Sequence, residues 1–98
     1  MDNLFEVFNF RHFENTSRNG SIRRGYFDIR FYIGNTEWVV TRSFKLYEKD
    51  GESYVLPPAE KNKNGRFDDF VELSGDRQNG LRLSITEHAV NIYKTLQK

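Results

Sequence analysis

The 98-residue chain contains no cysteine, only two prolines and one tryptophan, and only two histidines, His12 and His88. Without cysteine, neither a disulfide framework nor a cysteine-ligated zinc site is available. A zinc site needs about three or four protein ligands, and two histidines alone do not supply them. No apolar run approaches the roughly 20 residues that cross a membrane. The N-terminal residues also lack the basic start and apolar block of a signal peptide, so we expect a cytoplasmic protein.

The sequence lacks a nucleophile elbow, a glycine-rich phosphate loop and a His/Asp/Ser arrangement. Asp68, Asp69, Glu72 and Asp76 are an acidic group of the kind that can hold magnesium in a nuclease. Strand alternation, however, places Asp68 and Glu72 on the face opposite Asp69, which favours solvated charge. We therefore expect no enzyme and no cofactor, and keep a metal-dependent nuclease as a third alternative.

Basic and acidic residues are unevenly distributed along the chain, although the net charge is only +1. Residues 18–45 carry a net charge of +4, residues 46–76 carry −4, and residues 77–98 carry +3. If the first and last of these segments meet in space, the fold has one basic side.

The clearest strand signal is the stretch 24–33, which alternates with period two. Phe27, Ile29, Phe31 and Ile33 fall on one side, as expected for a strand that covers a core. The other side carries polar and aromatic residues, namely Arg24, Tyr26, Asp28, Arg30 and Tyr32. Tyrosine rings stack on bases, and arginines pair with phosphates.

Further strands are expected where apolar runs are separated by turn signals. These strands are residues 4–13, 37–47, 53–56, 66–73 and, as a short one, 81–83. Apolar residues occur in both phases of 4–13, which indicates burial on both faces or a bulge. Asp50-Gly51 predicts a tight hairpin turn, and Pro57 ends the strand before it. In 37–47, the residues in one phase are Trp38, Val40, Phe44 and Leu46, interrupted by Arg42.

The C-terminal residues predict a helix. Ser84 and Glu87 match a capping box, and four apolar residues follow at helical spacing, namely Ile85, Ala89, Ile92 and Leu96. The predicted fold class is α+β, with residues 1–98 forming a single domain. It is a twisted antiparallel sheet of about five to six strands with one C-terminal amphipathic helix.

The order of elements resembles the stage V sporulation protein G (SpoVG) family of small bacterial regulators that bind nucleic acid. The resemblance is carried by residues 43–47, an Asp-Gly turn, residues 54–57, residues 64–69 and the terminal helix. It implies a dimer formed by sheet pairing. It also implies DNA contacts from basic residues on or near the helix, where this chain has Arg82 and Lys94.

Residues 80–84 and the helix after them are also similar to the PC4-type single-strand-binding coactivator family. That resemblance covers the last third of the chain. It too implies a dimer, with nucleic acid held on a curved sheet.

From these observations we predict a small nucleic-acid-binding regulator that acts as a homodimer and has no membrane partner. The expected phosphate-binding residues are Arg23, Arg24, Arg30 and Arg42, with Arg82 and Lys94 adjoining. Tyr26 and Tyr32 are expected to stack on unpaired bases. Single-stranded DNA, duplex DNA and RNA stay open as ligands.

Two other interpretations of the same residues stay open. In the first, the tyrosine and arginine side chains form a solvated face that is stabilised by cross-strand pairs, and Asp28 forms an ion pair with an arginine. Alternatively, the chain is a protein-interaction or assembly module that uses the aromatic face or an edge strand.

Overall fold

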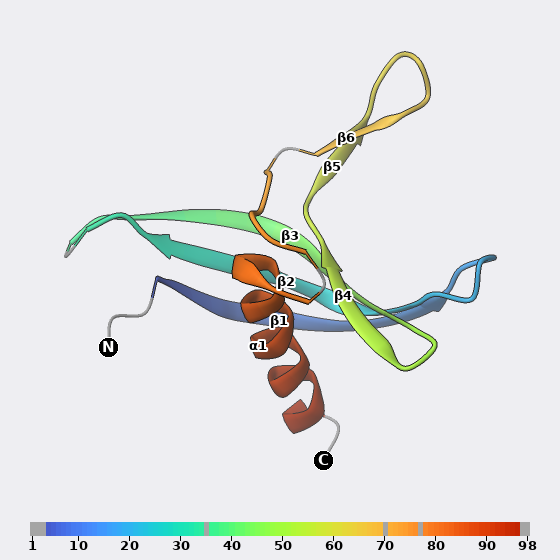
Figure 1. Cartoon of the computed structure of the whole chain (residues 1–98), viewed down its shortest axis with the longest axis horizontal. Coiled ribbons are helices and arrows are strands. Elements are labelled where there is room, and N and C mark those ends of the chain that lie inside the picture. The colour runs from blue at the N-terminus through green and yellow to red at the C-terminus, as the bar shows by residue number, and fades with distance from the viewer. Residues whose placement is uncertain (1–3, 35, 70, 77, 97–98) are drawn as a thin grey trace.

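The protein forms a four-stranded antiparallel sheet, a separate two-stranded sheet and one C-terminal helix (Figure 1). The computed structural model describes residues 4–34, 36–69, 71–76 and 78–96. The elements are β1 (Phe5–Thr16), β2 (Ile22–Tyr32), β3 (Trp38–Lys49), β4 (Glu52–Leu56), β5 (Ala59–Lys61), β6 (Phe67–Asp69) and α1 (Gly80–Leu96). The α+β class and the C-terminal helix are confirmed, but the main sheet has four strands and not five or six.

The main sheet is a meander in the order β1-β2-β3-β4. The β3–β4 hairpin turns at Asp50 and Gly51, whose φ angles are 54° and 82°. A two-residue loop with positive φ at both positions matches the twist of antiparallel strands, and Asp-Gly is a favoured sequence for it. Lys49 pairs with Glu52 across the turn. The predicted hairpin turn is therefore confirmed.

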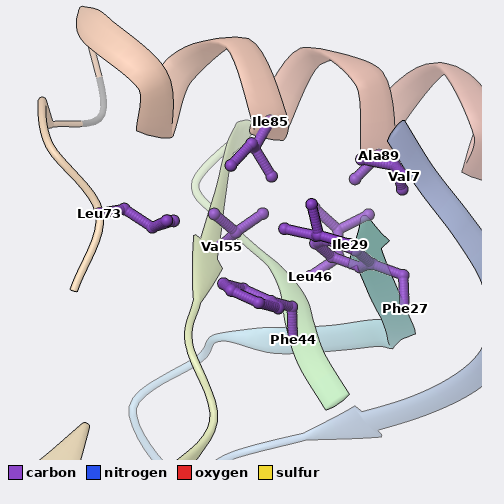
Figure 2. Packing of buried hydrophobic residues seen from close by; sticks show 9 residues of the cluster. All are labelled: Val7, Phe27, Ile29, Phe44, Leu46, Val55, Leu73, Ile85 and Ala89. Atoms are coloured by element: carbon purple, nitrogen blue, oxygen red, sulfur yellow. The ribbon is translucent and has the colours of Figure 1, made fainter. Parts of the chain in front are cut away.

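The core lies between one face of this sheet and α1 (Figure 2). Phe27 and Ile29 of β2 are fully buried, as are Ile85 and Ala89 of α1. In Figure 2 these side chains meet others from β1, β3, β4 and the segment before α1, namely Val7, Phe44, Leu46, Val55 and Leu73. Most of the apolar phase of the 24–33 stretch and most of the helical stripe therefore cover the same core. Ile33 and Leu96, at the ends of these two patterns, are exposed, which differs from the prediction.

The helix begins earlier than the sequence analysis predicts. Residues 81–83, expected as a strand, form the first turn of α1, and Ser84 lies inside the helix and not at a capping position. The Asp76 carboxylate folds the preceding loop by accepting from the backbone N–H groups of Gln78 and Asn79. Leu81 packs against the core and extends the apolar stripe by one turn. No helix in the described part of the chain is long and apolar enough to cross a membrane.

The pairing register shifts at four places, two in β1, one in β2 and one in β3. The bulges at Asn9 in β1 and at Ser43 in β3 both change which residues share a face. Asn9 and Ser43 have φ angles of 56° and 66°, and the pairing register shifts at both places. In β3, Phe44 pairs with Phe27 in the core, whereas Trp38 pairs with Tyr32 on the other face. Of the two alternatives given for the first strand, burial on both faces or a bulge, the pairing register shows a bulge. The common phase predicted for Trp38, Val40, Phe44 and Leu46 is wrong, because the extra residue at Ser43 reverses the phase.

β5 and β6 form a hairpin that projects from the main sheet (Figure 1). The turn between them is closed by Asn62, whose backbone N–H donates to the Arg66 carbonyl. The strand predicted over residues 66–73 is shorter, since β6 ends at Asp69. Phe70, which that prediction included, lies outside the described residues.

Gly25 of β2 is expected to tolerate no side chain. A Cβ atom at this position would lie 2.6 Å from the Arg11 carbonyl oxygen and 2.8 Å from the Phe10 ring. We expect Gly25→Ala to lower the free energy of unfolding by about 2 kcal/mol, because a buried clash forces neighbouring groups to move. Chemical denaturation measures this. Gly34→Ala is the control, since a Cβ atom there meets nothing within 4 Å; equal stability of the two variants would contradict the prediction.

Candidate nucleic-acid interface

The face of the main sheet opposite α1, here called the outer face, carries the arginine and aromatic side chains that the sequence analysis singled out. Among the described elements, none packs over this face, since α1 contacts the sheet through the core side. Cross-strand partners share a face. The pairs Arg11–Tyr26, Tyr26–Lys45, Arg30–Val40 and Arg23–Tyr47 therefore place side chains of β1, β2 and β3 side by side.

Arg24 does not lie on the outer face. The register between β2 and β3 shifts between Arg23 and Gly25, so the extra residue turns Arg24 to the helix side. Its guanidinium donates to Glu14 (Nη1–Oε1 2.7 Å) and to Glu48 (Nη2–Oε1 3.3 Å). The predicted common face of Arg24 with Tyr26, Arg30 and Tyr32 is therefore wrong.

Arg24 also connects the sheet to the helix. Its guanidinium carbon lies 5.5 Å from the centre of the Tyr93 ring of α1, and the Tyr93 hydroxyl donates to Glu14. Hydrogen bonds from Arg24 and then from Tyr93 hold the pKa of Glu14 below its ordinary value. These contacts indicate that Arg24 has a structural role.

Asp28 occupies the centre of the outer face and is only 1% exposed. Its carboxylate accepts from Arg11 (3.2 and 3.3 Å), from the Asn9 side chain (2.8 Å) and from Arg42 (3.3 Å). The backbone N–H of Ser43 donates a further bond of 3.0 Å. Asn9 and Ser43 are the positive-φ residues of two of the bulges, one in β1 and one in β3. Asp28 thus lies between these two bulges and accepts a hydrogen bond from each of them. The sequence analysis considered for Asp28 only an ion pair with an arginine.

The environment of Asp28 favours its ionised form. Burial by itself raises the pKa of the carboxyl, because it disfavours the charge. Hydrogen bonds from Arg11, Asn9 and the Ser43 backbone outweigh burial, so the pKa lies below its ordinary value. The carboxylate consequently remains negative at neutral pH and holds two arginines in place on the outer face.

One end of the outer face is built around Arg30. Its guanidinium carbon lies 5.0 Å from the centre of the Phe8 ring and 5.5 Å from that of the Trp38 ring. Glu6 accepts from Arg30 Nη1 (3.0 Å) and from the Tyr32 hydroxyl (3.2 Å). Trp38 is nevertheless 56% exposed, so one of these rings keeps a free surface.

The other end is built around Arg23. Its guanidinium donates to the hydroxyls of Tyr26 and Tyr47, and it lies within 6.0 Å of the Phe13 ring centre. Phe13 is 49% exposed and packs against Tyr26 with ring centres 6.0 Å apart. Tyr47 in turn stacks on Tyr54 of β4. Aromatic rings and an arginine therefore occur at both ends of the face.

The predicted contribution of the helix residues is not found on this face. Arg82 lies in the first turns of α1 and donates to the Val55 carbonyl oxygen (3.3 Å). Lys94 lies in the last turn of α1. Because α1 packs on the core side, neither residue adjoins Arg23, Arg30 or Arg42.

Four outer-face residues that the proposal below uses were missed by the sequence analysis, namely Arg11, Phe13, Trp38 and Lys45. The first two follow the β1 bulge, which removes the simple alternation that would have identified them. Trp38 was assigned to the apolar phase of its strand. Two of the arginines that bond to Asp28 keep exposed side chains, with Arg42 at 70% and Arg11 at 42% side-chain exposure.

In the described part of the chain, no three His, Asp or Glu side chains converge as a metal site would require. The side chains of Asp68 and Asp69, which the sequence analysis considered for such a site, lie outside those described. Comparisons with protein-family models, curated proteins and solved structures find no match to this chain.

Proposed function

We propose that the protein is a small nucleic-acid-binding regulator of the cytoplasm, and that the outer face is its binding surface. The observation that carries the proposal is the alternation of exposed aromatic rings with arginines across an uncovered sheet face. Trp38 and Phe13, at opposite ends, offer rings to bases, and Arg42 and Arg11 between them offer cations to phosphates. The resemblances to the SpoVG and PC4-type families favour the same function.

The charge of the outer face supports this proposal. Arg11, Arg23, Arg30, Arg42 and Lys45 are basic, against Glu6 and Asp28. Both carboxylates are already paired within the face. Arg11 and Arg42 donate to Asp28, and Arg30 donates to Glu6. A surplus of positive charge therefore remains, which suits a polyanion.

A second candidate function is favoured by the exposed apolar side chains at the end of the sheet where β1 begins and the β2–β3 turn lies. This apolar end consists of Leu4, Tyr32, Ile33, Trp38 and Val39, each at least 39% exposed. Exposed apolar clusters mark interaction sites. The alternative is therefore an assembly module, and the apolar end also provides a surface for the proposed homodimer.

The salt dependence of binding distinguishes the two candidates. Fluorescence anisotropy of the protein with labelled single-stranded DNA, duplex DNA and RNA is the measurement. Binding through phosphates must weaken as salt rises, whereas an apolar protein interface is indifferent to salt. No binding to any of the three at low salt would remove the nucleic-acid proposal and leave the assembly module.

We expect Arg42→Gln combined with Lys45→Gln to flatten the salt dependence. Each lost phosphate contact lowers the slope of log affinity against log salt by about 0.7 for a single strand, so the expected reduction is about 1.4. Lys94→Gln is the control, because it removes a positive charge from the helix side and should leave the slope unchanged. If the double variant keeps the slope of the unmodified protein, or if the control lowers the slope as much as the double variant does, the phosphates do not bind at Arg42 and Lys45.

A further inference from the structure

The two most exposed aromatic rings among the described residues of the outer face lie far apart along β2. At one end of the strand, Trp38 pairs with Tyr32. Toward the other end, the Phe13 ring packs against Tyr26 with ring centres 6.0 Å apart. Tyr32 and Tyr26 are six positions apart, and a strand rises about 3.3 Å per residue, so the two exposed rings are separated by about 20 Å along the sheet.

Both rings are held in place by contacts within the protein. The guanidinium carbon of Arg30 lies 5.5 Å from the Trp38 ring centre, and that of Arg23 lies 6.0 Å from the Phe13 ring centre. Each ring is nevertheless about half exposed. A side chain that is already ordered loses little conformational freedom when a ligand binds, so these rings are prepared to stack on flat ligand groups.

The middle of the outer face, between the two rings, carries two cations. Asp28 lies on β2 four positions from Tyr32 and two from Tyr26. Its carboxylate holds the guanidinium groups of Arg42 and Arg11, at 3.3 and 3.2 Å. Both arginines keep exposed side chains. The order along β2 is therefore ring, cations and ring, which suits a chain that offers bases to the rings and phosphates to the arginines.

Only unpaired bases can use both rings. In a duplex each base is stacked on its neighbours, so its flat faces are not accessible to protein side chains. A duplex groove admits a helix or a two-stranded ribbon, whereas the outer face between Trp38 and Phe13 spans three strands with α1 packed behind them. We propose, as a refinement that rests on the proposed function, that the ligand is single-stranded nucleic acid that lies along β2 with one base stacked on Trp38 and another on Phe13.

The separation of the rings sets a minimum length for this ligand. A strand with the duplex spacing of about 3.4 Å per nucleotide needs about six nucleotides to join the two rings, and a more extended strand needs fewer. A trinucleotide reaches one ring and the arginines, but not both rings. Because the second ring binds a strand that is already tethered, we expect the affinity to rise at least tenfold from three to six nucleotides and far less from six to twelve.

Fluorescence anisotropy of the full chain with labelled deoxythymidine and uridine oligonucleotides of three, six and twelve nucleotides tests this length dependence. Trp38→Ala and Phe13→Leu each remove one ring, and leucine keeps apolar packing against Tyr26. We expect each variant to lose the gain in affinity from three to six nucleotides, because the strand then has only one ring on which to stack. Leu96→Ala, which removes exposed apolar surface from α1, should keep the gain.

The proposal is overturned if a duplex of twelve base pairs binds as tightly as the twelve-nucleotide strand, or if the affinity does not rise between three and six nucleotides. It is also overturned if both ring variants keep this gain. In these cases the outer face still binds nucleic acid, so the proposed function is retained. Failure of every oligonucleotide to bind at low salt removes the proposed function as well. The expected gain in either series supports the proposal, and the tighter series identifies DNA or RNA as the ligand.

Discussion

Asp28→Ala is expected to lower the free energy of unfolding by about 3 kcal/mol, the largest loss of stability that we predict for a single substitution. The Asp28 carboxylate is almost completely buried and accepts hydrogen bonds from four different residues. Removing it leaves the Ser43 N–H and the Asn9 amide without their acceptor, and leaves Arg11 and Arg42 close together without the intervening negative charge. Because the two arginines are partly exposed, water compensates some of this loss, which is why the value is at the lower end for a broken buried ion pair.

The same carboxylate should make the stability of the protein sensitive to acid. The folded-state pKa of Asp28 lies below its ordinary value. A group of this kind contributes stability that is fully present above its unfolded pKa of about 3.9. That contribution is lost as the pH falls from there through the folded pKa. In Asp28→Asn the contribution is absent, so we expect a weaker loss of stability between neutral and acidic pH than in the unmodified protein.

Chemical denaturation at neutral pH and near pH 3 tests both statements. Glu37→Gln is a suitable control, because Glu37 is an exposed acid beside the β2–β3 turn and its removal should change little. Some acid sensitivity should persist in every Asp28 variant, since the pKa of Glu14 is also lowered. If Asp28→Ala unfolds at the same denaturant concentration as the Glu37 control, the two bulges do not depend on this carboxylate.

Trp38→Ala is expected to weaken nucleic-acid binding by about tenfold or more, the largest effect on affinity that we predict. A base stacked on an aromatic side chain contributes roughly 1–3 kcal/mol. Trp38 is the largest exposed ring on the outer face, and it packs against the Arg30 guanidinium, which is fixed in turn by Glu6. A base that stacks there would therefore meet a ring held in place before binding. Trp38→Phe should retain part of the affinity.

Two control variants separate stacking from other losses of apolar surface. Leu96→Ala removes exposed apolar surface from the end of α1, on the other side of the sheet, and should bind nucleic acid normally. Ile33→Ser alters the apolar end without touching the rings of the outer face, so it should affect self-association alone. Anisotropy and sedimentation measurements on all three variants provide the test. If Trp38→Ala binds normally but loses self-association together with Ile33→Ser, Trp38 belongs to a protein interface and not to a base-stacking surface.

Much of the fold could be predicted because it depends on local patterns. The alternation of Phe27, Ile29 and Phe31, the Asp-Gly turn and the helical stripe from Ile85 to Leu96 each specify an element within a few residues. The predictions failed where an element depends on its neighbours. Residues 81–83 alternate like a strand, yet they join the helix because Leu81 reaches the core and the loop before it is folded by Asp76.

In the candidate site, too, the residues that follow a local pattern were predicted correctly, and those that depend on neighbouring elements were not. Arg23, Tyr26, Arg30, Tyr32 and Arg42 were predicted from the sequence and do lie on the outer face. Arg24 was misplaced because a bulge reverses the alternation, and a bulge has no reliable signature in a single strand. Arg82 and Lys94 were expected beside the site, but α1 packs on the other face of the sheet.

The sequence by itself determined the types of element, the apolar side of the central strand, and the supply of arginine and aromatic residues. Only the tertiary structure decided which of these residues share a surface. Pairing register is set by contacts between strands, and one extra residue in β1, β2 or β3 moves every following side chain to the opposite face. In this protein the buried Asp28 carboxylate bonds to the bulge residues Asn9 and Ser43 on both sides, so a contact between three strands fixes the arrangement of the outer face.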